Sequence, residues 1–301
     1  LITQIINQDL SNNNFSFSKF FIKRIKRLFP ALLSVLIIVI LASFFVLSPT
    51  DYIKISKSAI SSFFFVSNFY YWSESNYFDQ INEFKSLVHT WSLGIEMSFY
   101  LLIPFILIFF KKFNKKISLF SISFFLVITI IICFYFNSKG PVIENKEFNE
   151  ILYGKYISDT LFYLIPFRLY EFFFGVSLYY LPKYNFKKLQ KQIFFVLGIV
   201  LIIISLILIK PYLELQIIYT IPCLIGSSII IYFRDTEYLN LILKNKILVF
   251  LGLISYSLYL IHWPIITLYR YVKVEKLIIS EKVIILLLSI LLSFISLKII
   301  E

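Results

Sequence analysis

The sequence predicts an all-α fold, a polytopic transmembrane helical bundle with about eight spans. Of its 301 residues, 59% are hydrophobic and only 15% are charged, which is too apolar for a water-soluble domain of this length. Eight apolar runs are long enough to cross the ~30 Å hydrocarbon layer, which takes roughly 20 residues of helix. The basic residues gather in alternate loops, as in multi-pass membrane proteins. We therefore expect a single transmembrane domain over residues 1–301.

The predicted spans follow these apolar runs. They cover residues 28–47, 91–110, 117–136, 160–181, 193–209, 215–233, 247–269 and 283–300. Residues 1–6 are typical of the tail of an earlier helix, and the chain begins with Leu1, so we expect an N-terminally truncated domain. The apolar stretch 60–72 is too short to span and indicates an interfacial or re-entrant segment.

Loop charges test the span count independently. One set of alternate loops holds 16 basic and 3 acidic residues, whereas the opposite set holds 11 of each. The basic set comprises residues 19–27, 111–116, 183–191 and 234–246. Because cytoplasmic loops carry the excess of Lys and Arg, we place this set in the cytoplasm and residues 51–90 outside. The net charge of +12 then reflects topology and contact with anionic membrane lipid, with no need for nucleic acid as a partner.

Few charged side chains lie within the predicted spans. Glu96, Arg168 and Glu171 do, and a charge near the bilayer centre costs about 2.5 to 3.5 kcal/mol on insertion scales. His89 and His262 lie close to the outer ends of their helices. On the predicted topology all five residues fall in the outer half of the bundle, which indicates a polar cavity there.

Each of these residues also has a structural interpretation. Arg168 and Glu171, three residues apart, could be a satisfied ion pair that holds helices together. Glu96 could be a hydrogen-bonding residue in helix packing. His89 and His262, each close to a tryptophan, could be ordinary interfacial residues.

A basic segment, KRIKRLFP at residues 23–30, leads directly into the first predicted span. Arg24 and Arg27 share a helix face, a spacing that suits gripping a phosphate with two guanidinium groups. The alternative is a plain topology anchor with its positive charge inside.

The cysteines predict no metal chemistry. Cys133 and Cys223 each stand alone in an apolar run, without a second ligand at metal-binding spacing. We interpret both as small apolar packing residues and expect no metal site.

Three segments together resemble the acyltransferase type 3 family of bacterial membrane proteins. They are FIKRIKRLFPALL at residues 21–33, HTWSLGIEMSFYLLIPF at 89–105 and LGLISYSLYLIHWPII at 251–266. Supporting segments are PFRLYEFFFG at 166–175, IPCLIG at 221–226 and LKIIE at 297–301. The segments occur in the family's order and cover nearly the whole chain.

The resemblance implies a bundle of about ten helices in a bacterial inner membrane. It implies an enzyme that moves an acyl group, usually acetyl, from cytoplasmic acyl-CoA to a hydroxyl of a cell-surface glycan or its lipid-linked precursor, such as O-antigen, capsule or exopolysaccharide. The paired arginines of the family map onto Arg24 and Arg27, which would contact the acyl-CoA phosphates.

The family's first helix carries an arginine and a histidine linked to catalysis, and the present residues start after it. No histidine here takes that role by motif, and we expect the chain alone to be inactive. The candidate catalytic residues are Glu96, His262, His89, Arg168 and Glu171. The histidines qualify because deprotonating a sugar hydroxyl calls for a base that titrates near neutral pH.

Other classes of membrane protein fit part of the pattern. A transporter or flippase of lipid-linked saccharide also needs buried charges, but its expected broken helices in symmetric places are sparse here. A glycan polymerase or ligase would carry a catalytic set in a large outer loop, and residues 48–90 lack an obvious one. An interaction scaffold would not need charges within its spans.

Overall fold

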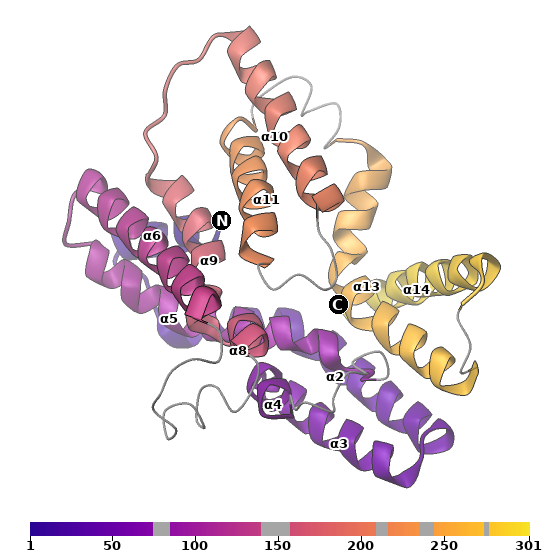
Figure 1. The fold of residues 1–301 in the computed structure, drawn as a ribbon. Coiled ribbons are helices and arrows are strands. Elements are labelled where there is room, and N and C mark those ends of the chain that lie inside the picture. Colours follow the sequence, from indigo (N-terminus) through magenta and orange to yellow (C-terminus); the bar gives the residue numbers. More distant parts are fainter. Residues whose placement is uncertain (75–84, 140–156, 209–215, 235–243, 274–276) are drawn as a thin grey trace. The chain divides into compact units, whose positions relative to one another are not determined.

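The computed structural model describes residues 1–74, 85–139, 157–208, 216–234, 244–273 and 277–301 (Figure 1). All regular elements within these ranges are helices, which confirms the predicted all-α class. The chain divides into two compact units. We call Ser16–Tyr100 together with Val249–Glu301 the α2 unit, and Leu1–Phe15 together with Leu101–Leu248 the α6 unit.

Within the described residues, six helices are long and apolar enough to cross a membrane, fewer than the eight spans predicted. They are α2 (Phe17–Val46), α5 (Trp91–Phe110), α6 (Lys115–Lys139), α10 (Lys188–Leu208), α13 (Lys246–Lys273) and α14 (Ile279–Ile299). A further apolar helix, α11 (Gln216–Tyr232), is shorter. Many Leu, Ile and Phe side chains on these helices are exposed, as expected for surfaces that contact lipid. The protein is therefore a multi-pass helical membrane protein.

The prediction of one continuous helix over residues 160–181 was wrong. The segment consists of α8 (Ile157–Tyr163), a 3-10 turn η3 (Ile165–Phe167) and α9 (Leu169–Tyr180). Leu164 is extended, with φ −94° and ψ 135°, and Pro166 follows inside the turn, where its missing N–H leaves no helical bond unmade.

Helix starts in the α2 unit follow from local sequence. The Ser16 hydroxyl accepts a hydrogen bond from the Lys19 N–H at the start of α2. Ser48 caps α3 (Pro49–Phe63) in the same way, with proline in the first turn. The short apolar stretch 60–72 forms the end of α3 and most of α4 (Ser67–Glu74), joined by a turn in which Phe65 has a φ of 58°.

In the α6 unit, α9 packs against α6 and also contacts α1 (Ile2–Ser11), the helix predicted as the tail of an earlier one. Cys133, Phe167 and Tyr170 form a buried cluster there. The Cys133 thiol donates to the Phe167 carbonyl at 3.3 Å. Cys133 is thus a free, buried thiol, which agrees with its interpretation as a packing residue.

Helices α10 and α11 lie side by side in the α6 unit (Figure 1). A Cβ atom on Gly226 would lie 2.5 Å from the Gly198 carbonyl oxygen, and one on Gly198 would lie 2.9 Å from the Gly226 carbonyl oxygen. The two backbones approach so closely that only glycine fits at either position.

Part of the predicted loop charge pattern lies outside the described residues, including Asp79, Glu83, Glu144 and Glu147.

We predict opposite effects for two glycine-to-alanine substitutions. Gly226→Ala should lower the free energy of unfolding by about 1 to 3 kcal/mol, because its Cβ overlaps the facing backbone. Gly252→Ala, in α13, should be neutral or raise it by about 0.5 to 1 kcal/mol, because its Cβ meets open space and alanine favours helix. Thermal unfolding in detergent measures both. Equal effects would contradict the close α10–α11 approach.

Candidate active site

A buried hydrogen-bond network holds the start of α5 in the α2 unit. The Thr90 hydroxyl, in the turn η2 (Val88–Thr90), donates to the Leu87 carbonyl at 2.7 Å and pairs with the Ser62 hydroxyl at 2.7 Å. The Ser67 hydroxyl donates to the Thr90 carbonyl at 2.8 Å. Ser62, Ser67 and Thr90 are almost fully buried, so α3 and α4 together fix this turn.

Gly94, one turn into α5, allows the helix to lie directly on the α3–α4 connection. A Cβ there would lie 2.5 Å from the Asn68 Oδ1 atom and 3.1 Å from the Phe65 carbonyl oxygen. The position of α5 is therefore set by close contact with the Asn68 side chain of α4 and with the Phe65 backbone.

His89 is buried in η2 with only 7% of its surface exposed. Neither ring nitrogen has a hydrogen-bond partner within the described part of the chain. The Leu260 backbone lies beside the ring, but no hydrogen bond of normal geometry joins them. The His89 ring centroid is 5.9 Å from that of His262 and 5.2 Å from that of Tyr259. A buried imidazole with two unsatisfied nitrogens is costly, and such costs are typical of functional sites.

Helix α13 is joined at two points to residues 85–92, which we call the η2 segment. The Tyr259 hydroxyl donates to the His89 carbonyl and is also hydrogen-bonded to the Ser92 hydroxyl. The Trp263 indole N–H donates to the Lys85 carbonyl at 3.0 Å. These bonds hold the α13 turn that carries His262 against the residues around His89.

The tautomer of His262 follows from its hydrogen bond. Its Nδ1 atom lies 2.9 Å from the Leu258 carbonyl oxygen, one turn back in α13. A carbonyl can only accept, so Nδ1 carries the proton and Nε2 of the neutral ring has a free lone pair. His262 is partly exposed, and this nitrogen is the group in the site best suited to accept a proton.

Glu96 connects the start of α5 with the basic turn of α2. The Tyr100 hydroxyl donates to its carboxylate, one helical turn away. The Arg24 guanidinium carbon lies 3.6 Å from the Phe20 ring centroid and 5.9 Å from that of Tyr100. The Arg24 Nη1 atom also donates to the Phe20 carbonyl at 3.0 Å. Arg24 is thus held over aromatic faces by cation–π contact.

Arg27 is exposed and makes no hydrogen bond or salt bridge within the described residues. The Tyr256 hydroxyl, in α13, donates a hydrogen bond to the Leu28 carbonyl at 2.7 Å. The same side chain interacts electrostatically with Arg27, Glu96 and Glu301. The basic turn of α2 therefore stands beside α13 as well as α5.

The two remaining predicted site residues, Arg168 and Glu171, lie in the α6 unit. Their side chains form a salt bridge of 2.7 Å between Nη1 and Oε1, and the Arg168 Nε atom donates to the Phe162 carbonyl at 3.1 Å. Arg168 stands at the start of α9 instead of inside a span, and is 8% exposed. This geometry favours the structural interpretation, an ion pair that ties η3 to the first turn of α9.

Sequence reasoning missed the tyrosines of the α2 unit. Tyr100 had a local signal, since it follows Glu96 by four residues and so shares its helix face. Tyr259 had none, because it reaches a carbonyl 170 residues away in the chain. Only the fold brings these groups together with His89, His262, Glu96 and Arg24.

The chain is similar in sequence to known bacterial proteins. A Haemophilus influenzae protein without a functional name is 30% identical over 201 residues, which cover 66% of this chain and 78% of that protein. The O-acetyltransferase OatA of Staphylococcus aureus is 30% identical over 282 residues, which cover 88% of this chain and 44% of that protein. The chain thus spans less than half the length of OatA. No solved structure matches it significantly.

A family model described as an acyltransferase domain matches residues 2–298, nearly the full length. The chain belongs to the acyltransferase type 3 family of membrane enzymes.

Proposed function

We propose that the protein transfers an acyl group, most simply acetyl, from acyl-CoA to a hydroxyl of a cell-surface glycan or its lipid-linked precursor. The observation that carries the proposal is the chain of contacts from Arg24 through Tyr100 to Glu96, in the unit that also holds His89 and His262. Arg24 supplies a cation in this unit, and His262 supplies a proton acceptor. Acyl transfer from a phosphorylated donor to a hydroxyl needs both groups.

Arg24 and Arg27 form the proposed donor end. Arg24 is oriented by the Phe20 ring, and Arg27, one turn away, has an exposed guanidinium without a partner among the described residues. Two guanidinium groups at this spacing match the phosphates of the CoA nucleotide. A basic segment of the cytoplasmic face suits a donor made in the cytoplasm.

His262 and His89 form the proposed acceptor end. His262 Nε2 takes the proton of the attacking hydroxyl as the new C–O ester bond forms at the thioester carbonyl. The C–S bond breaks, and the departing thiolate takes this proton from the His262 imidazolium, which regenerates the neutral base. His89 lies beside His262, with 5.9 Å between the two ring centroids, and contributes to the same acceptor end. Tyr259 positions the η2 backbone through its hydrogen bond to the His89 carbonyl. Glu96 orients Tyr100 beside Arg24.

The direct test is acetylation of the native surface. The full-length protein, expressed in a strain without surface O-acetylation, should restore ester acetate on purified polysaccharide, measured by NMR. Acetate absent despite good membrane expression and intact acyl-CoA binding would require another acyl group. If ester acetate and acyl-CoA binding were both absent, the enzyme proposal would be wrong, and transport of a lipid-linked saccharide would be favoured.

We predict that Arg24→Gln/Arg27→Gln weakens acyl-CoA binding by roughly 10²- to 10⁴-fold, because two charge-assisted hydrogen bonds of about 1.5 to 3 kcal/mol each are lost and a tenfold change corresponds to about 1.4 kcal/mol. The matched control is Lys19→Gln/Lys23→Gln, which removes two charges from the same part of α2. Equilibrium binding to purified protein measures both. If both variants lost the same acyl-CoA affinity, the arginines would contribute only positive charge and would not contact the phosphates specifically.

His262→Gln should behave differently. It removes the proton acceptor, so the turnover number kcat should fall by about 10² to 10⁴-fold, while acyl-CoA affinity stays within a factor of about two. Acetyl transfer to a soluble acceptor sugar, followed at several donor concentrations, separates the two quantities. Near-normal turnover would exclude His262 as the base.

A further inference from the structure

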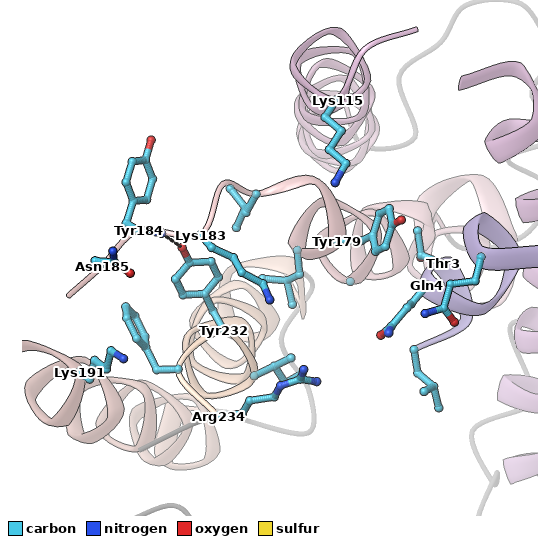
Figure 2. A pocket seen from close by; sticks show the side chains of 17 residues that line it. Thr3, Gln4, Lys115, Tyr179, Lys183, Tyr184, Asn185, Lys191, Tyr232 and Arg234 are labelled. Carbon is cyan, nitrogen blue, oxygen red and sulfur yellow. Dashed lines mark hydrogen bonds between the residues drawn. The ribbon is translucent and has the colours of Figure 1, made fainter. Parts of the chain in front are cut away.

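A cavity of about 590 Å³ lies in the α6 unit and has no lining residue in common with the proposed active site (Figure 2). Its walls come from α1, the start of α6, the end of α9, the segment that follows α9, α10 and the end of α11. This volume falls within the usual range for small-molecule sites, roughly 300 to 1,000 Å³.

The cavity is strongly basic. Lys115, Lys183, Lys191 and Arg234 line it, and no Asp or Glu is among the described residues that do so. Figure 2 shows the charged ends of Lys183 and Arg234 directed into the space between Tyr232 and Tyr179. The four cations come from three separate loop regions, so only the fold brings them together. Their mutual repulsion favours a bound anion.

The lysine amines have no competing partner in the described chain. The side chains of Lys115, Lys183 and Lys191 make no hydrogen bond or salt bridge to described residues. Neutral donors stand beside them, since Gln4, Gln8 and Asn185 also line the cavity. Ammonium, guanidinium and amide groups around one cavity are the donors that recognise phosphate oxygens.

The cavity wall is built, not a chance grouping of loops. The Tyr232 hydroxyl donates to the Pro182 carbonyl and accepts from the Tyr184 N–H at 3.2 Å. The Phe194 ring of α10 stacks on the Phe233 ring, which follows α11, with 5.0 Å between the ring centroids. The close contact of Gly198 with Gly226 also fixes α10 on α11. These contacts fix the backbone segments that carry Lys183, Lys191 and Arg234 relative to one another.

We propose that this cavity binds a phosphate-bearing ligand. Two sources share the chemistry, the headgroup of an anionic phospholipid and the nucleotide phosphates of a soluble donor such as CoA. A basic pocket between helices at a membrane surface suits the first, and the tyrosines and amides suit the second equally well. Neither Arg24 nor Arg27 lines this cavity, and the proposed site does not depend on the proposed acyl transfer.

The test compares two double variants of the full-length protein with equal charge change. Lys183→Gln/Lys191→Gln removes two lining amines. The control Lys116→Gln/Lys187→Gln removes two exposed amines that do not line the cavity, one next to Lys115 and one between Lys183 and Lys191 in the sequence. Binding of adenosine 3′,5′-bisphosphate is measured by calorimetry. Retention of phosphatidylglycerol against phosphatidylcholine is measured by native mass spectrometry. Thermal unfolding confirms that both variants fold.

The cavity variant should lose roughly tenfold or more affinity for one of the two probes, and the control should match the wild type. Loss of lipid retention assigns the headgroup, and loss of nucleotide binding assigns the soluble donor. The proposal is overturned if neither probe is affected, or if both variants lose affinity equally. Surface acetylation, measured in parallel, separates the outcomes, because it can fail while cavity binding remains intact.

Discussion

The buried hydrogen bonds around Thr90 are the constraint on which the α2 unit depends. In a low-dielectric interior a hydroxyl or carbonyl without a partner is costly, so Ser62, Ser67 and Thr90 must stay together once α3, α4 and η2 are packed. Gly94 then brings α5 into backbone contact with the α3–α4 turn. The direction of α5, and with it the placement of Glu96, follows from these contacts.

From this anchored helix, aromatic side chains carry the arrangement outward. Tyr259 and Trp263 tie α13 to the η2 segment through main-chain carbonyls, whereas Tyr100 links a carboxylate to the aromatic face that holds Arg24. Tyrosine and tryptophan suit this task because each combines a large apolar body with one polar atom. A membrane interior tolerates few charged groups, and here the Phe20 and Tyr100 side chains orient Arg24 and Glu96.

Sequence reasoning predicted most of the helices, because a long apolar run can satisfy its backbone in a bilayer only as helix. The predicted run 91–110 matches α5, and α13 and α14 extend their predictions by a few residues. It failed at residues 160–181, where hydropathy stays high through the break and only Pro166 signals a turn. The alignment of Tyr259 with His89 depends on tertiary packing, which hydropathy does not encode.

The length of α2 has a consequence for where water-borne molecules can meet the protein. Its 30 residues make a rod of about 45 Å, roughly 15 Å longer than the hydrocarbon layer. Unless strongly tilted, the helix must project beyond the acyl chains, and Lys19, Lys23 and Arg27 mark the projecting end. Pro30 lies just past it and removes one helical hydrogen bond, which makes a natural bending point. A highly charged molecule could therefore be held at the headgroup level, with only a slender uncharged arm entering the bilayer.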